Sequence, residues 1–254
     1  VSTDTRLASV DVAHRNGTTA VVWRRYEANE AMLALEGARA LDPTRVSSND
    51  SLRARNPSVA LVDGTPVVAY RGYTGSSSSW VGVLAVGATE PRYTEFGTGI
   101  GPESISPVVS AGPAGATVAW VDTDETAAEV APLTQSADGT LAVGEPTTAG
   151  RSRTLRSMSG TGQLAEVQLS NSGSGSVLLW TDLGSVQAAA LSDGAPAVEP
   201  TPLGGGQNPS IGAGDGRWLA TTMVQDRASG IDVRYTLVEN GETEPGTLPR
   251  PASA

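Results

Sequence analysis

The chain of 254 residues contains no cysteine, no lysine, one phenylalanine and one histidine. Without cysteine it has no disulfide framework, no thiolate chemistry and no cysteine-based zinc site. The single histidine, His14, excludes a multi-histidine metal site, and a Ser-His-Asp triad would have to use it. No G-x-S-x-G motif accompanies His14, so we expect it to be a hydrogen-bonded structural residue beside the Asn16-Gly17 turn.

Positive charge and long apolar runs are also scarce. The 17 basic residues, all arginine, stand against 27 acidic residues, which gives a net charge of −10 and a pI near 4.6. Binding of nucleic acid or of an anionic membrane needs clustered positive charge, so neither partner is expected. No run of 18 apolar residues exists, so no membrane span is predicted. The lysine-free composition is typical of GC-rich genomes such as those of actinobacteria. Together with a start that lacks methionine, it favours an exported bacterial protein, extracellular or in the cell envelope.

What the sequence does contain is a unit that recurs five times. Each copy has an apolar run, a tight turn and a second apolar run that ends on an anchor residue, as in "NPSVALVDGTPVVAYRG", where the anchor is Tyr70. The anchors are separated by 47, 50, 60 and 42 residues and are Trp23, Tyr70, Trp120, Trp180 and Thr222. A third apolar stretch and a weaker fourth follow each anchor. Each copy therefore predicts four short strands.

A period near 50 residues with four strands is typical of a propeller blade. We predict an all-β fold, a single five-bladed β-propeller of four-stranded antiparallel blades over residues 1–254. The repeats are expected at about 7–50, 51–103, 104–150, 160–205 and 206–248. The alternative is a pair of β-sandwiches, but a closed ring explains the repetition because it removes exposed sheet edges.

Local signals agree with this fold. Pro57, Pro107 and Pro209 are expected at strand starts, where no ladder hydrogen bond is lost. The pairs Asn16-Gly17, Asp63-Gly64 and Asp215-Gly216 suit tight hairpins that need positive φ angles. The four aromatic anchors are expected to pack between blades. The last blade's outer strand has two candidate sources, "VSTDTRLA" at the N-terminus and "ETEPGTLP" near the C-terminus, and both stay open.

The loose unit "P-x-V-x-x-x-x-G-x-x-V-A-W" resembles sialidase-like and lectin-like β-propellers of exported bacterial proteins, over residues 7 to 248. The Asp-box of that family, S-x-D-x-G-x-T-W, is missing, and "SADGTL" at 136–141 is the nearest fragment. The resemblance therefore implies the fold and does not imply sialidase activity.

In such a ring the loops after the second strands and before the first strands open on one face, where polar groups at the channel mouth are the expected ligand site. The residues predicted to gather there are Arg24, Arg25, Asn56, Arg71, Asp122, Asp124, Asp182, Asn208 and Asp226. We predict no catalytic residue, no metal and no cofactor. "DTDE" at 122–125 lacks the glycine and distal glutamate of an EF-hand, and "RSRTLR" at 151–156 is expected to be a solvated loop between blades.

The favoured hypothesis is a non-catalytic recognition or assembly module that binds a protein partner or a carbohydrate at the channel mouth. One alternative is a glycan-active hydrolase, which needs two carboxylates about 5 to 10 Å apart. Its candidate acids are Asp11, Asp122, Glu166, Asp182 and Asp226, and no spacing singles out a pair. A further alternative is the sensor domain of an envelope lipoprotein, with a lipid anchor upstream of this chain.

Overall fold

The computed structural model describes most of the chain, and the account below concerns that part. The described ranges are 7–25, 28–36, 43–47, 53–74, 78–86, 92–100, 106–112, 115–122, 126–136, 140–153, 166–171, 175–192, 195–197, 199–214, 217–226, 230–239 and 242–248. Within these ranges every regular element is a β-strand, so the all-β prediction is confirmed. None of the described residues forms a helix that could cross a bilayer.

The strands form five antiparallel sheets in chain order. Sheet 1 consists of β1 (Leu7–Arg15), β2 (Thr18–Arg25), β3 (Glu30–Glu36) and β4 (Thr44–Arg45). Sheet 2 consists of β5 (Arg53–Val62), β6 (Thr65–Thr74), β7 (Ser78–Ala85) and β8 (Arg92–Ile100). Sheet 3 consists of β9 (Val108–Gly112), β10 (Gly115–Asp122), β11 (Ala127–Gln135), β12 (Leu141–Val143) and β13 (Thr147–Arg151). Sheet 4 consists of β14 (Val167–Asn171), β15 (Ser176–Asp182), β16 (Ser185–Ser192), β17 (Ala195–Pro196) and β18 (Thr201–Gly205). Sheet 5 consists of β19 (Gln207–Gly214), β20 (Arg217–Asp226), β21 (Gly230–Glu239) and β22 (Glu242–Thr247). The prediction of four strands in each sheet is therefore wrong for sheets 3 and 4, where two short strands pair with successive parts of the third strand.

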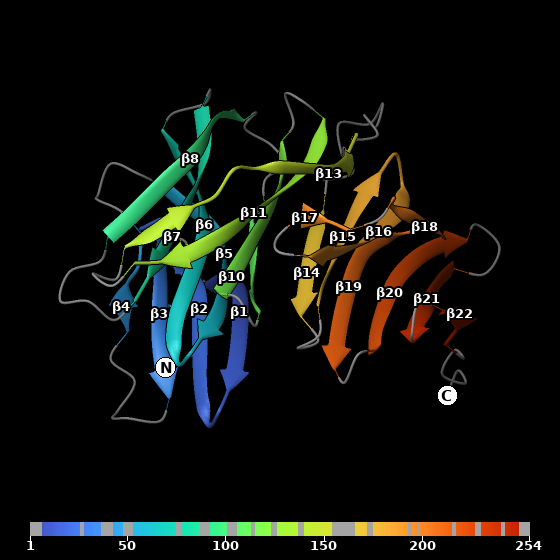
Figure 1. Cartoon of the computed structure of the whole chain (residues 1–254), viewed down its shortest axis with the longest axis horizontal. Coiled ribbons are helices and arrows are strands. Elements are labelled where there is room, and N and C mark those ends of the chain that lie inside the picture. Colours follow the sequence, from blue (N-terminus) through green and yellow to red (C-terminus); the bar gives the residue numbers. More distant parts are fainter. Residues whose placement is uncertain are drawn as a thin grey trace.

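The first strand of each sheet faces a common centre. These five inner strands, β1, β5, β9, β14 and β19, line one cavity, and each lies against the inner strand of the next sheet along the chain. The later strands of each sheet extend outward from this centre (Figure 1). The sheets are thus arranged like successive blades around a hollow axis.

The core is divided among the junctions between neighbouring sheets. Four separate apolar clusters fill the junctions of sheets 1 and 2, 2 and 3, 3 and 4, and 4 and 5. Three aromatic anchors lie in them, each against the preceding sheet: Tyr70, Trp120 and Trp180, all at most 2% exposed. The prediction that the aromatic anchors pack between sheets is confirmed for these three, whereas the fourth, Trp23, is buried but belongs to none of the four clusters. Each junction removes apolar surface from water, which is the main force holding neighbouring sheets together.

Turn chemistry explains how each hairpin closes. Asn16-Gly17 and Asp63-Gly64 have positive φ at both residues, the geometry predicted for two-residue hairpins. Leu183-Gly184 adopts the same geometry between β15 and β16, although leucine rarely adopts positive φ. Asp215-Gly216 lies outside the described residues. A two-residue turn therefore reverses the chain even where the sequence carries no Asn or Asp signal.

Three inner strands contain a β-bulge near their start. The bulged residues Ser9, Asn56 and Asn208 all have positive φ. Pro57 and Pro209 follow directly, so each proline lies where the ladder is interrupted and its missing N–H costs no ladder hydrogen bond. Pro107 lies just before β9. The bulges locally redirect the inner strands at one end of the cavity.

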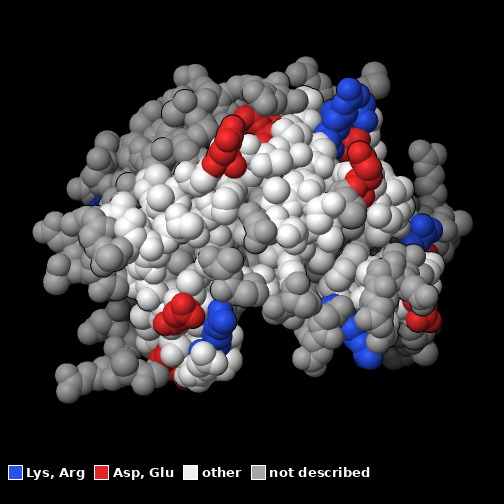
Figure 2. Space-filling view, in the orientation of Figure 1, with Lys and Arg blue, Asp and Glu red and all other residues white. Residues whose placement is uncertain are grey.

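The arc of sheets has an open seam between its first and last members. β22 supplies the fourth strand of sheet 5, which settles the source of that strand in favour of the C-terminal segment. In the described part of the chain, β1 and β19 make no extensive contact, unlike the other neighbouring inner strands. Figure 2 shows the molecule notched at its lower edge, between the region of sheet 1 and that of sheet 5. Closure of the ring is therefore not seen.

Candidate functional site

The candidate site is the central cavity, which has a volume of about 1130 Å³. Ligand pockets are usually about 300 to 1,000 Å³ in volume, so this cavity accommodates a ligand larger than a single small metabolite. All five sheets contribute to its wall. The lining residues are 9–15 of β1, 56–61 of β5, 106–112 (which include the two residues before β9), 168–171 of β14, and Ile211 of β19. No single sheet could form it. The repeated arrangement of the sheets is what creates the site.

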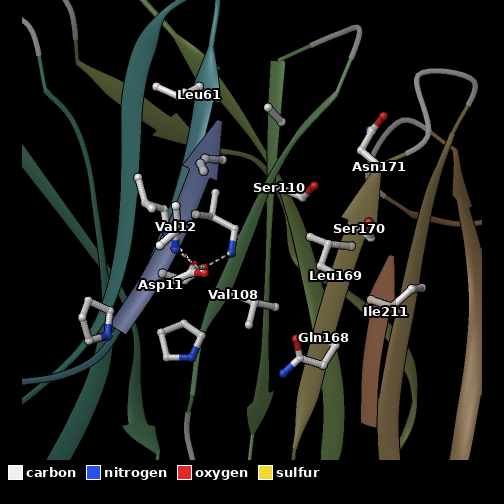
Figure 3. A pocket seen from close by; sticks show the side chains of 18 of the residues that line it. Asp11, Val12, Leu61, Val108, Ser110, Gln168, Leu169, Ser170, Asn171 and Ile211 are labelled. Atoms are coloured by element: carbon white, nitrogen blue, oxygen red, sulfur yellow. Dashed lines mark hydrogen bonds between the residues drawn. The ribbon is translucent and has the colours of Figure 1, made fainter. Parts of the chain in front are cut away.

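Among the described residues that line this cavity, Asp11 is the only carboxylate. Its Oδ1 accepts from the Val12 backbone N–H at 2.9 Å, and its Oδ2 accepts from Ser58 Oγ and the Val59 N–H, each at 2.9 Å (Figure 3). Ser58 Oγ in turn accepts from the Val109 N–H at 3.2 Å. The carboxylate thus ties β1 to β5, and the serine extends the link to β9. Asp11 stabilises the wall, and no second acid among the described lining residues stands beside it for hydrolysis.

Apart from Asp11, His14 and Arg15, the polar side chains of the described wall are neutral. Figure 3 shows Ser110, Gln168, Ser170 and Asn171 on the strands around the hollow. Asn171 donates through Nδ2 to Ser176 Oγ at 2.8 Å, and Gly112 leaves room for it, because a Cβ there would lie 2.7 Å from Asn171 Nδ2. Apolar surface is interspersed among these amide and hydroxyl groups and comes from Val12, Val108, Leu169 and Ile211. Such a wall offers hydrogen bonds and apolar contacts to a ligand, and its charged groups are not all of one sign.

Of the predicted binding residues, Asn56 is the one that lines the cavity. It lies on a bulge with φ of 47°, and its Nδ2 donates to Ser106 Oγ, the residue at the corresponding point of the next sheet. A hydrogen bond therefore joins sheets 2 and 3 at the rim of the cavity. Ser9 is the bulged residue of β1 that corresponds to Asn56 on β5.

The predicted arginines lie at the ends of second strands, inside or beside the junctions. Arg24 and Arg71 are 8% and 6% exposed. Arg24 donates to Asn29 Oδ1 at 2.6 Å, and Arg71 lies opposite Arg55 in the β5–β6 ladder. Arg25 pairs with Glu30 at 2.5 Å. The structure does not bring these three arginines together on the cavity wall.

The predicted acidic residues are likewise dispersed. Asp182 accepts from Nε of Arg153 at 2.9 Å and from its Nη2 at 2.7 Å, and this hydrogen bonding lowers the pKa of the Asp182 carboxyl against the opposing effect of burial. Asp122 ends β10. Asp124 and the side chain of Asp226 lie outside the described residues, as does most of "DTDE". The binding role of these residues stays a prediction.

Glu166 is held at the junction of sheets 4 and 5. It is half-buried directly before β14, and burial raises the pKa of its carboxyl, an effect that the Asn208 backbone N–H partly offsets. Asn208 itself is exposed on its bulge, with φ of 49°. The two residues form a cross-sheet link at the rim, equivalent in place to that of Asn56 and Ser106.

His14 lines the opposite part of the cavity, near the β1–β2 turn. Its Nδ1 lies 3.0 Å from Thr19 Oγ1, so the predicted hydrogen bond is present. Within the part of the chain described, no three His, Asp or Glu side chains gather as a metal site would require. The wall residues that sequence reasoning missed are the small polar ones, Ser110, Gln168, Ser170 and Asn171. Their place on the predicted inner strands is the signal in the sequence that could have identified them.

No family model and no curated protein matches the sequence. Among solved structures the chain is similar to a thermostable family-43 glycoside hydrolase (TM-score 0.52, 9% identity, covering 96% of this chain and 95% of that one). It is also similar to the SapL1 lectin in complex with alpha methyl fucoside (TM-score 0.53, 12% identity, 96% and 80%). A third is the Hadza microbial sialidase Hz136 (TM-score 0.51, 10% identity, 92% of this chain and 56% of that one). These neighbours are β-propellers, so the predicted resemblance in fold is confirmed.

Proposed function

We propose that this chain is a non-catalytic binding module, a five-bladed β-propeller in which the central cavity takes an uncharged, hydroxyl-rich ligand of the carbohydrate class. The observation that carries the proposal is the neutral polar wall contributed by several sheets. The side chains of Ser110, Gln168 and Ser170 make no hydrogen bond with other described residues. Sugar hydroxyls both donate and accept, and so do amides and serine hydroxyls.

The fold supports a binding role without deciding the ligand. Both a lectin and glycoside hydrolases are found among the structural neighbours. The hydrolase alternative needs a pair of carboxylates, whereas the lining residues include Asp11 alone, whose oxygens already accept hydrogen bonds from the wall. Neutral amide and hydroxyl groups can hold a ligand, but they do not supply the acid and the base that glycoside hydrolysis requires. Binding is therefore favoured over hydrolysis.

A glycan array, followed by calorimetry on the strongest oligosaccharide and on methyl α-fucoside, tests the proposal. Gln168→Ala should weaken affinity roughly five- to tenfold, because one hydrogen bond is worth about 1 kcal/mol. Gln135→Ala is the matched control, since Gln135 is exposed on β11 and does not line the cavity. Failure of every glycan to bind, or equal affinity of Gln168→Ala and wild type, would overturn the proposal.

Hydrolysis is tested separately with a panel of p-nitrophenyl glycosides. We expect no release of nitrophenol above a buffer blank. Turnover that Asp11→Asn abolishes would establish the hydrolase alternative instead.

The cell exterior or envelope is the proposed location, and the composition of the sequence is its support. Immunodetection in fractions of the source bacterium tests it. Detection in the cytoplasmic fraction alone would contradict it.

A further inference from the structure

The strand registers identify one equivalent residue on each of the first four inner strands. It is paired with the residue two places before the anchor of its sheet. In sheets 1 to 4 these residues are Val12, Val59, Val109 and Leu169. All four line the cavity. Because their positions match, the surroundings of their backbone N–H groups can be compared directly.

In the first three sheets the N–H group of this residue already has an acceptor. The Val12 and Val59 N–H groups donate to the two oxygens of Asp11, each at 2.9 Å. The Val109 N–H donates to Ser58 Oγ at 3.2 Å. Asp11 and Ser58 are themselves equivalent, since each lies directly before the equivalent residue of its own strand. A chain of side-chain acceptors therefore runs from sheet 1 to sheet 3.

This chain of acceptors is interrupted on β9. The residue of β9 that lies where Asp11 and Ser58 do is Val108, which is paired with the residue directly before the anchor Trp120. The side chain of valine cannot accept a hydrogen bond. Sheet 3 therefore offers no side-chain acceptor, at this position, to the N–H group of the equivalent residue in sheet 4.

The Leu169 N–H in sheet 4 points away from its own sheet. The Thr181 N–H donates to the Glu166 carbonyl at 3.1 Å, so every second residue from Glu166 onward bonds to β15. Leu169 lies between two such residues, and its N–H is directed away from β15. Among the described residues, none accepts a hydrogen bond from this N–H. The cavity wall thus holds a backbone donor that is open to a ligand.

The surroundings of this donor are apolar on one side and polar on the other. The half-buried side chains of Val108 and Leu169 pack on the same core cluster and line the cavity (Figure 3). Ser110 lies two residues after Val108, hence on the same side of β9 and about 7 Å further along the strand. Its hydroxyl makes no hydrogen bond with other described residues. One spot therefore combines an N–H donor, a small apolar surface and a hydroxyl acceptor.

We propose that this spot binds the acetamido group of an N-acetylated amino sugar, which presupposes the carbohydrate-binding function proposed above. The acetamido carbonyl accepts from the Leu169 N–H, and the methyl group contacts the side chains of Val108 and Leu169. The acetamido N–H donates to Ser110 Oγ. All three features of the group are matched by the wall.

Two other ligand groups match the spot less well. A carboxylate would accept from the Leu169 N–H, but the Val108 side chain would desolvate its charge without a countercharge. Asp11 also contributes a negative charge to the same cavity. A sugar hydroxyl would satisfy the N–H and leave the apolar surface of Val108 uncovered. The acetamido group is therefore favoured over both.

Calorimetry with two matched oligosaccharides tests the proposal. Chitotriose and cellotriose have the same backbone and differ in carrying an acetamido group or a hydroxyl at C2. Chitotriose should bind about tenfold more tightly, because it adds one hydrogen bond and one buried methyl group. If glycans bind but chitotriose binds no more tightly than cellotriose, the acetamido site is excluded and the proposed function stands. Failure of every glycan to bind would overturn both.

Val108→Thr separates recognition of the acetamido group from general damage to the wall. It places a hydroxyl acceptor where Asp11 and Ser58 have theirs, so the Leu169 N–H no longer needs the ligand. Affinity for chitotriose should fall about tenfold and affinity for cellotriose should change less than about twofold. Val143→Thr is the matched control, because Val143 is half-buried on β12 and does not line the cavity. Equal losses for both saccharides in Val108→Thr would contradict the proposal.

Amide hydrogen exchange, followed by NMR, tests the open donor without relying on affinity. In the free protein the Leu169 N–H should exchange faster than the Val109 N–H, which already donates to Ser58. Saturating chitotriose should slow the exchange of Leu169 towards the rate of Val109. Equal protection of the two amides in the free protein would show that Leu169 already has an acceptor, and would overturn the proposal.

Discussion

The side chains of the cavity wall differ in how much of their hydrogen-bonding capacity is already used. Asp11 accepts three hydrogen bonds and Asn56 donates to Ser106, so both support the wall itself. Gln168 and Ser170 line the same cavity with their side-chain groups uncommitted among the described residues. Residue type alone therefore does not separate ligand-binding groups from supporting ones, since the partners of each group decide its role.

At the residue scale, Glu166 gives a pH-dependent prediction. Burial raises the pKa of its carboxyl in the folded state, so the folded chain holds this proton more tightly than the unfolded chain. Ionisation therefore reduces stability as pH rises through the raised pKa, and stability is regained as pH falls towards the unfolded value of about 4.3. Glu166→Gln, which mimics the protonated acid, should be more stable than wild type at neutral pH.

Urea unfolding of both proteins across the acidic range measures this difference. It should disappear below about pH 4, where wild-type Glu166 is protonated in both states. Glu199→Gln is the control because Glu199 is exposed. A variant equally or less stable than wild type at neutral pH would contradict the account.

At the scale of elements, the inner strands are joined by side chains as well as by apolar packing. In the described part of the chain, every backbone ladder lies within one sheet. Asp11 and Ser58 bridge β1, β5 and β9 through hydrogen bonds to backbone N–H groups. Such bridges fix the height of one inner strand relative to the next, which apolar contacts alone specify poorly because they are not directional.

A double-mutant cycle on this bridge is the element-scale prediction. Asp11→Ala and Ser58→Ala should each lower the free energy of unfolding by about 1 to 3 kcal/mol, because each leaves an N–H group of the wall without its acceptor. Their effects should be coupled by at least about 0.5 kcal/mol, since the two side chains share a hydrogen bond. Ser110→Ala, on the same wall without such a bond, should change stability by less than about 0.5 kcal/mol. Additive effects in urea unfolding would show that the bridge is not a unit.

At the scale of the whole molecule, charge is spread over the surface. Figure 2 shows acidic and basic side chains scattered in small groups on the face in view. A net charge of −10 produces self-repulsion that opposes the compact state. A net negative charge of this size disfavours the binding of polyanions.

Salt should therefore stabilise the protein at neutral pH. Raising NaCl from about 0.05 to about 0.5 M screens the repulsion and should raise the urea midpoint. At pH 4.6, near the isoelectric point, the same change in salt should have a much smaller effect, which separates charge screening from other salt effects. Equal shifts at both pH values would contradict the explanation.

The sequence by itself determined the fold class, the succession of sheets and the local turns. Period and alternation are local properties of the chain, so five successive sheets and the turns at Asn16-Gly17 and Asp63-Gly64 were predictable. The fifth strands of sheets 3 and 4 were not predicted. The aromatic anchors were predictable as core residues for the same reason. The turn at Leu183-Gly184 was not predictable, because leucine has no preference for the positive φ that it adopts in this hairpin.

Only the tertiary structure decided which polar residues meet. Arg24 and Arg71 directly follow equivalent anchor residues in sequence and are buried. Gln168 and Ser170, in contrast, reach the cavity from an inner strand. Which groups converge depends on how the sheets are placed around the axis, and that placement is set by packing between residues far apart in the chain. The open seam has the same origin, since it depends on the angle between five successive sheets and not on any local run of residues.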